Sequence, residues 1–294
     1  MKILITGGRG MLGRTLCAEL GGVHEVEVAD LPEWDITNAD AFLSKTLAAA
    51  PDVVIHCAAM TNVDACESQR DLAFRLNEEG TRNVAVATKA AGARLVAIST
   101  DYVFSGNPPR EPWAWGEDDI ANPRTVYGAS KLGGERMVQM ICPDSSVILR
   151  IAWLYGAGGP SFVHTMSALG MKEGAPLKVV DDQRGNPTSA RAVAGAIKFL
   201  LAHPEVTGVV HGTCEGQCSW CDFAKELFRL IEAKRRAEGG DARMREIVPC
   251  TTAEFPRPAP RPANSALRKS VLNKLGYRTP RWQDALAEFV EEEF

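Results

Sequence analysis

The chain has 294 residues, 45% of them hydrophobic, which suffices for one large domain or two smaller ones around a sizeable core. Its 33 basic and 37 acidic residues are mixed along the sequence and give a formal net charge of -4. This balance argues against a nucleic acid or an anionic membrane as a partner.

The first residues, MKILITGG, hold an apolar run that is too short for a secretory signal or a membrane span, so we expect a cytoplasmic protein. Its eight cysteines are then expected to be reduced thiols. Cys214, Cys218 and Cys221 have a spacing that some iron–sulfur enzymes use. Because Ser219 is a good N-cap for the helical pattern that follows, we favour a helix start there over a metal cluster.

The first half of the chain alternates short apolar runs with helical patterns. In chain order, strands are predicted at 2–6, 25–29, 52–55, 94–100 and 146–151, and helices at 11–20, 38–49, 72–92 and 125–141. This alternation predicts a parallel sheet with helices on both faces.

The second half is less regular. Helices are predicted near 161–172, 189–202 and 219–235, a strand at 177–180, and a proline-rich run at 254–263 with a further helical pattern after it. We expect an α/β, Rossmann-type doubly wound parallel sheet over residues 1–152 and a smaller, mainly substrate-binding domain over 153–294. Segments near 187–215 are expected to return to the large sheet.

The sequence between the first strand and the first helix predicts a dinucleotide-binding loop. Glycines let the backbone approach a pyrophosphate, and the following helix offers free N–H groups. The residues concerned are Gly7, Gly10, Met11, Leu12 and Gly13. Asp30 ends the second strand, where it would bind the adenosine ribose, but Arg9 could hold a 2′-phosphate, so NADPH or NADH stays open. Asp35 and Ile36 could flank the adenine, or a capped helix could start at Asp35 or Thr37.

Candidate reactive groups follow the third, fourth and fifth strands, as expected at the carboxyl edge of such a sheet. The small residues of 56–61 would let backbone lie beside a cofactor. Tyr127 could donate a proton to a reduced carbonyl, and Lys131, four residues on, shares its helix face and would favour the tyrosinate. Thr100 could bind the substrate oxygen and orient the tyrosine. Arbitrary Tyr-x-x-x-Lys pairs are common, so spacing alone leaves a surface pair or core packing open.

Four segments resemble the extended short-chain dehydrogenases/reductases: TGGRGMLG, HCAAMTNVDACE, STDYVF and VYGASKLGGE. Later segments look like the RmlD-type dTDP-4-dehydrorhamnose reductases, namely RIAWLYG (150–156), VDDQRGNPT (180–188) and RPANS (261–265). The resemblance covers nearly the whole chain. It implies reduction of the 4-keto group of dTDP-4-dehydro-6-deoxy-L-mannose to dTDP-L-rhamnose by hydride from NAD(P)H.

The resemblance also implies roles for single residues. Tyr127 would be the proton donor, Lys131 its partner and a ribose ligand, and Thr100 the residue that tunes the tyrosine. Ala58, Ala59, Met60 and Thr61 would lie along the cofactor. The residues implied at the substrate are Thr100, Asp101, Trp153, Gln183, Arg261 and Asn264. From the residues alone, Trp153 could equally pack in the core, and Arg261 could be a solvated loop arginine.

Two departures and two alternatives remain. The link from Asp101 to Tyr127 looks a few residues longer than the family suggests. Some family members hold Mg²⁺ at a dimer contact with glutamates, but for Glu291, Glu292 and Glu293 we favour a solvated acidic tail. The alternatives are another nucleotide-linked 4-keto-6-deoxy sugar as substrate, or a non-catalytic regulatory subunit like that of methionine adenosyltransferase. We expect a monomer or a homodimer.

Overall fold

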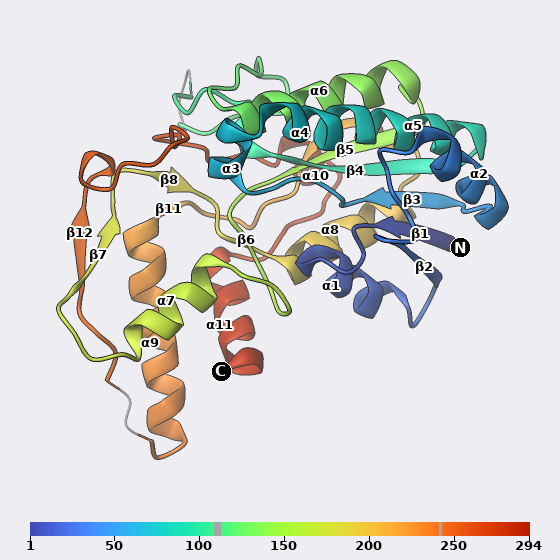
Figure 1. Ribbon diagram of the computed structural model, residues 1–294. Coiled ribbons are helices and arrows are strands. Elements are labelled where there is room, and N and C mark those ends of the chain that lie inside the picture. Colours follow the sequence, from blue (N-terminus) through green and yellow to red (C-terminus); the bar gives the residue numbers. More distant parts are fainter. Residues whose placement is uncertain (109–112, 241–242) are drawn as a thin grey trace.

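The computed structural model describes residues 1–108, 113–240 and 243–294. Its main feature is a six-stranded, wholly parallel sheet in the order β10-β5-β4-β3-β1-β2. The strands are β1 (Lys2–Thr6), β2 (Glu25–Ala29), β3 (Val53–His56), β4 (Arg94–Thr100), β5 (Ser146–Ile151) and β10 (Gly208–His211). The first five were predicted within one residue, and the doubly wound α/β fold is confirmed (Figure 1).

Helices cover both faces of this sheet because alternate strand residues point to opposite sides. Ile3 and Ile5 pack against α1 (Met11–Leu20) and α8 (Ala190–Ala202), while Leu4 faces the layer of α2, α5 and α6. These three helices span Ala39–Ala49, Gly80–Ala90 and Val126–Ile141.

The helical region between β3 and β4 differs from its prediction as one helix over 72–92. It is divided into α3 (Val63–Ser68), α4 (Arg70–Phe74), the π-turn η1 (Arg75–Glu79) and α5. The side chain of Asn62 starts α3 by accepting a bond from Ala65 N at 3.0 Å. Likewise α2 is capped by Asn38 and not by Asp35 or Thr37, because Asn38 Oδ1 accepts from Ala41 N.

The remaining elements form a smaller assembly, which Figure 1 shows mostly to the left of the large sheet. Its helices are α7 (Phe162–Gly170), α9 (Trp220–Ala237) and α11 (Trp282–Glu293), with α10 (Ser270–Lys274) under β10. Three two-stranded sheets pair β6 (Leu154–Tyr155) with β9 (Thr188–Ser189), β7 (Leu177–Val180) with β12 (Ile247–Cys250), and β8 (Arg184–Gly185) with β11 (Cys218–Ser219). Two-residue strands carry no readable alternation, so β6, β8, β9 and β11 escaped prediction. The turns η2 (Asp101–Val103) and η3 (Thr252–Glu254) complete the order.

We propose that residues 1–152 form the cofactor-binding unit and that 153–294 form most of a substrate-binding unit. One support is that the two units have different hydrophobic cores. Phe223, Leu227 and Phe289 belong to a cluster in the smaller assembly, whereas the residues of the large sheet belong to other clusters. The other support is the return of 187–215 to the large sheet, where α8 lies on α1 and β10 pairs with β5. No helix among the described residues is long and apolar enough to cross a bilayer.

Candidate active site

The glycine loop leaves no space for side chains where it meets its neighbours. Gly7 has a φ of +65°, and a Cβ there would lie 2.7 Å from the backbone nitrogen of Ala58. A Cβ on Gly13 would lie 2.3 Å from the carbonyl oxygen of Gly7. The N-cap of α1 is Gly10, which has no capping side chain, and the first turn of α1 carries no acid. The first N–H groups of α1, including those of Met11 and Leu12, therefore keep the positive end that a pyrophosphate needs.

Asp30 and Arg9 meet at the rim of this loop. Asp30 Oδ2 accepts a bond from Arg9 N at 2.8 Å, and Oδ1 accepts one from Leu31 N at 2.8 Å. The Arg9 guanidinium is 57% exposed and reaches Glu33 at 3.3 Å. Both charged groups thus border the same edge of the loop, and the structure leaves the choice between NADPH and NADH open.

Asp35 and Ile36 stand close to this rim but are engaged with their own segment. Asp35 Oδ1 accepts bonds from the backbone and the hydroxyl of Thr37, both at 2.8 Å. Ile36 is 7% exposed, packs against Gly80, and its carbonyl accepts a bond from Asn83. The side chain of Ile36 is therefore mainly part of the core.

The loop after β3 is held by hydrogen bonds to the buried side-chain amide of Asn77. Asn77, on the π-turn η1, accepts from Met60 N at 2.8 Å, donates to Met60 O at 3.0 Å and donates to Ser130 Oγ at 3.0 Å. Ala58, Ala59 and Met60 are partly exposed and Thr61 is exposed, so this pinned backbone faces outward beside Gly7.

Tyr127 and Lys131 occupy the first turns of α6. Thr125 caps the helix by accepting a bond from Gly128 N at 3.0 Å. Gly128 is required because a Cβ would lie 2.1 Å from the carbonyl oxygen of Tyr102. Tyr127 is partly exposed, and burial raises its pKa, which the neighbouring Thr100 side chain partly offsets. The tyrosine and the threonine therefore meet, as the sequence predicts.

Lys131 does not behave as expected toward Tyr127. Burial lowers the pKa of Lys131 to about 8, and its Nζ donates to the carbonyl oxygen of Ile98 at 2.8 Å. The charges that act on the Tyr127 pKa belong to Asp101 and Cys66, and both raise it. In this arrangement Lys131 is not among the groups that act on the Tyr127 pKa, because its ammonium is turned toward β4.

Asp101 lies beneath Thr100. It is 2% exposed, its Oδ1 accepts a bond from the Thr100 hydroxyl at 3.0 Å, and burial raises its pKa to about 6. This gives the candidate site a second titratable group next to Tyr127.

Trp153 follows β5 in a left-handed conformation with a φ of +46°, which is uncommon for a non-glycine residue and occurs at functional sites. Its indole stacks on Trp220 with ring centroids 3.5 Å apart and a tilt of 5°. It also covers Gly185, where a Cβ would lie 2.3 Å from the ring. Gln183, 7% exposed, donates to the Thr252 hydroxyl at 2.9 Å and so ties neighbouring loops together.

Arg261 is not a solvated loop arginine in this structure, because it forms an ion pair with Asp64. Its two terminal nitrogens donate to the two oxygens of Asp64 on α3, at 2.9 and 2.8 Å. The arginine side chain is 20% exposed. The hydrogen bond from Arg261 is the main cause that lowers the pKa of Asp64.

Asn264 joins the carboxyl-terminal part of the chain to the segment after β4. Its backbone N–H donates to Gly106 O at 2.8 Å, and its side chain donates to Trp113 O at 2.8 Å. Its carbonyl accepts a bond from the indole of Trp115 at 3.1 Å. The long link from Asp101 to Tyr127 includes residues 109–112, which lie outside the described residues.

The family model described as RmlD substrate binding domain matches residues 1–294. The chain belongs to the RmlD substrate-binding domain family.

Several individual proteins are similar to this chain over nearly its whole length. A dTDP-4-dehydrorhamnose reductase of Streptomyces griseus is 42% identical over 97% of this chain and 91% of its own length. A probable dTDP-4,6-dihydroxy-2-methyloxan-3-one 4-ketoreductase of Streptomyces antibioticus is 41% identical over 98% and 94%. The crystal structure of a Bacillus anthracis dTDP-4-dehydrorhamnose reductase in complex with NADP has a TM-score of 0.89, 38% identity and 99% coverage of both chains.

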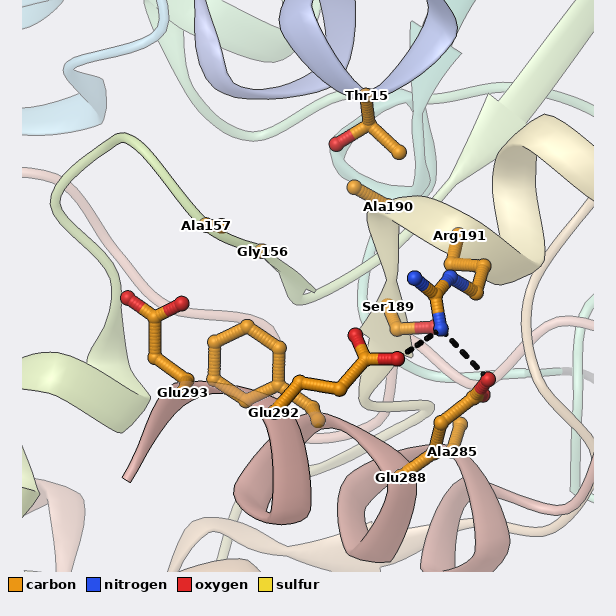
Figure 2. A pocket seen from close by; sticks show the side chains of 11 residues that line it. Thr15, Gly156, Ala157, Ser189, Ala190, Arg191, Ala285, Glu288, Glu292 and Glu293 are labelled. Atoms are coloured by element: carbon orange, nitrogen blue, oxygen red, sulfur yellow. Dashed lines mark hydrogen bonds and ion pairs between the residues drawn. The ribbon is translucent and has the colours of Figure 1, made fainter. Parts of the chain in front are cut away.

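The acidic end of this RmlD-family chain is the exposed last turn of α11, and part of it is ion-paired. Figure 2 shows Glu288 and Glu292 of α11 directed at Arg191 of α8, with Nη1 of Arg191 2.7 and 2.5 Å from their oxygens. Glu293 lies 3.4 Å from His164, while Glu291 is exposed. Within the described ranges no group of three or more acidic, histidine or cysteine ligands could hold a metal ion.

The three cysteines likewise follow the helix interpretation. Ser219 Oγ accepts a bond from Asp222 N at 3.0 Å, Asp222 Oδ2 accepts one from Ser219 N at 3.2 Å, and α9 starts at Trp220. Cys214, Cys218 and Cys221 are free thiols buried in the core of the smaller assembly.

Sequence reasoning missed four residues that shape this RmlD-family site. These residues are Asn77, Glu135, Ser265 and Trp220. For Asn77, Ser265 and Trp220 a single sequence gives no signal, because their partners lie far away along the chain. Glu135 is 4% exposed and forms a two-bond ion pair with Arg150, at 2.8 and 2.6 Å. Only Glu135 offered a clue, as a charge on the glycine-rich helix that also carries Tyr127.

Proposed function

We propose that the protein reduces the 4-keto group of dTDP-4-dehydro-6-deoxy-L-mannose, giving dTDP-L-rhamnose, with hydride from NADPH or NADH. The observation that carries this proposal is the meeting of Tyr127 and Thr100 beside Lys131, next to a glycine loop with an uncapped helix start. The names of relatives that match nearly the whole chain support the sugar.

The cofactor lies along the carboxyl edge of the first three strands. The backbone of Gly7, Gly10, Met11, Leu12 and Gly13 binds its pyrophosphate, since glycine contacts leave the N–H groups accessible. Asp30, Asp35 and Ile36 border the adenosine, and Ala58, Ala59, Met60 and Thr61 flank the nicotinamide side. When bound, the cofactor supplies the hydride.

Tyr127 donates the proton that the reduced oxygen needs. Burial keeps its hydroxyl protonated across the physiological range, which suits a proton donor. Thr100 binds the substrate oxygen and orients Tyr127. Lys131 donates one of its three ammonium protons to Ile98 O, and the remaining protons serve the nicotinamide ribose.

The sugar nucleotide lies between β4, β5 and the carboxyl-terminal segment. Thr100 and Asp101 contact the sugar, and the Trp153 indole, held flat by Trp220, forms a wall for it. Gln183 and Asn264 line the pocket. Arg261 binds the diphosphate. Its guanidinium donates two parallel hydrogen bonds to the two oxygens of Asp64, and phosphate oxygens can accept the same pair of bonds.

A second candidate substrate keeps the same chemistry. Another nucleotide-linked 4-keto-6-deoxy sugar is favoured by the 41% identity to the Streptomyces antibioticus relative, whose name specifies a different 4-ketoreductase reaction. We place the reaction in the cytoplasm and expect a monomer or homodimer that needs no Mg²⁺. Activity should survive a chelator, and sedimentation should give one or two chain masses.

The test is NADPH and NADH oxidation with enzymatically generated dTDP-4-dehydrorhamnose. Tyr127→Phe should reduce kcat by about 10²–10⁴-fold, as loss of a general acid does, while cofactor binding persists. Tyr277→Phe is the matched control, because Tyr277 stacks on Phe199 of α8 and is not one of the proposed site residues, and it should retain full activity. A wild-type protein that binds cofactor but never turns over would favour the regulatory-subunit alternative. Full activity in Tyr127→Phe would refute the role of the tyrosine.

A further inference from the structure

The hydroxyl of Thr100 has a defined direction in this structure. It donates to Asp101 Oδ1 at 3.0 Å and accepts a bond from Tyr102 N at 3.2 Å. A hydroxyl has a single proton, and an ionised carboxylate can only accept. While Asp101 is ionised, the Thr100 proton is therefore directed away from any substrate oxygen.

Asp101 is poorly satisfied as a carboxylate. Its Oδ2 and the hydroxyl oxygen of Ser265 are both buried without a hydrogen-bond partner among the described residues. Ser265 lies near enough to lower the pKa of Asp101, but the geometry is not that of a formed bond. Ser265 is 1% exposed and is held by its backbone N–H, which donates to Arg184 O at 2.8 Å. A buried carboxylate with one unbonded oxygen is costly to keep charged, so its neutral form is accessible.

We propose that Asp101 is a positioning residue that sets the direction of the Thr100 hydroxyl. Ionised Asp101 holds the Thr100 proton. Protonated Asp101 instead donates to Thr100 Oγ1, and the Thr100 proton turns to the keto oxygen of the substrate. This inference rests on the proposed function.

The proton balance of the reduction is unchanged by this arrangement. The keto carbon gains hydride from the cofactor, and the oxygen gains its proton from Tyr127. Asp101 and Thr100 only reorient their hydrogen bonds, and Asp101 keeps its proton over the cycle. Asp101 therefore acts through Thr100, in addition to its proposed contact with the sugar.

Few other charges act on Asp101. Its pKa is raised by burial and lowered by the side chains of Ser265 and Thr100 and by two backbone N–H groups. The titratable groups around it are Tyr102 on the same turn and Tyr127 on α6, with Arg261 and Asp64 acting on Tyr102. Asp101 should therefore titrate as a single group near pH 6, and reductive kcat/KM should fall as the pH rises through that value.

The experiment is the pH profile of kcat/KM for ketone reduction between about pH 5 and 8. Wild type should lose activity with one ionisation near pH 6. In Asp101→Asn this ionisation should disappear, because an amide cannot titrate whichever way it is turned. In Ser265→Ala it should move to higher pH by about half a unit or more, because a neighbour that favours the carboxylate is lost.

Ser167→Ala is the matched control. Ser167 is equally buried but donates to Val163 O within α7, so its removal should leave the profile unchanged. The inference is overturned if wild type shows no such ionisation or if Asp101→Asn retains it. If Asp101→Asn does not fold, an unshifted profile in Ser265→Ala overturns it. Absence of turnover in wild type would contradict the proposed function instead.

Discussion

Burial dominates the electrostatics of the reactive side chains. It raises the pKa of Tyr127 and lowers that of Lys131 to about 8, so in both cases the neutral form gains. A tyrosine that stays protonated suits reduction, in which the side chain must deliver a proton. Buried Asp101 follows the same rule, with a pKa raised to about 6.

Arg261 allows a test of diphosphate recognition at this scale. Arg261→Ala should raise the KM for the nucleotide sugar by roughly tenfold or more, as expected for losing a charge-assisted bidentate contact, with kcat nearly unchanged. Arg257→Ala on the same segment is the matched control, since Arg257 is exposed, lies over the Phe255 ring and acts on Asp64 through its charge alone, whereas Arg261 also forms hydrogen bonds to Asp64. Equal KM values in the two variants would show that Arg261 serves Asp64 alone.

At the scale of elements, the loops after the strands are shaped by contacts that leave no space for an added methyl group. Gly13 lies against the carbonyl of Gly7 and the backbone of Gly8, so the start of α1 can lie this close to the loop after β1 because position 13 has no side chain. The same principle holds on α6, where Gly128 faces Tyr102 and Gly134 faces Asn77 O at 2.4 Å from an added Cβ.

Gly13→Ala should therefore destabilise the fold by about 1–3 kcal/mol and abolish tight cofactor binding, because backbone atoms must shift. Gly22→Ala is the control: nothing lies within 4 Å of its added Cβ, and a small gain in stability is expected. Urea unfolding and NADPH fluorescence titration would measure both effects. A Gly13→Ala variant that binds cofactor normally would contradict the assigned loop.

The elements that could be predicted are those whose pattern is local. The apolar run 94–100 and the glycine loop can be recognised from neighbouring residues alone, and Ser219 is a residue type that favours the start of a helix. The π-turn that presents Asn77 could not be predicted, because its partners Met60 and Ser130 are 17 and 53 residues away. The pairing of Arg261 with Asp64, 197 residues apart, escaped for the same reason.

At the scale of the whole molecule, buried titratable groups link stability to pH. Burial lowers the pKa of His56 and of His211 to about 3, so between about 3 and 6.5 the unfolded chain binds more protons than the native one. Both histidines therefore add stability that is present above pH 6.5 and is lost as the pH falls. Asp101 has the opposite sign, since its raised pKa lets the native state bind one more proton between about 4 and 6.

The free energy of unfolding should thus fall as the pH is lowered from about 6.5 to 4. Each histidine contributes a slope of up to about 1.4 kcal/mol per pH unit. In His211→Gln the difference in bound protons between the unfolded and native states falls by one, so the slope should become shallower. In Asp101→Asn this difference rises by about one between about pH 4 and 6, so the slope should become steeper there. Urea unfolding at several pH values measures these slopes, and identical slopes in all three proteins would be inconsistent with buried neutral histidines.

The segment from Ala259 to Lys269 crosses back over the first half of the chain. It binds Asp64 through Arg261, Gly106 through Asn264 and Cys214 O through Lys269, so the proposed sugar-nucleotide contacts come from one of the last parts of the sequence to be made. During synthesis, the glycine loop and Tyr127 leave the ribosome well before Arg261 does. A nascent chain can therefore complete the large sheet, through β10, before the proposed sugar-nucleotide contacts of Arg261 and Asn264 become available.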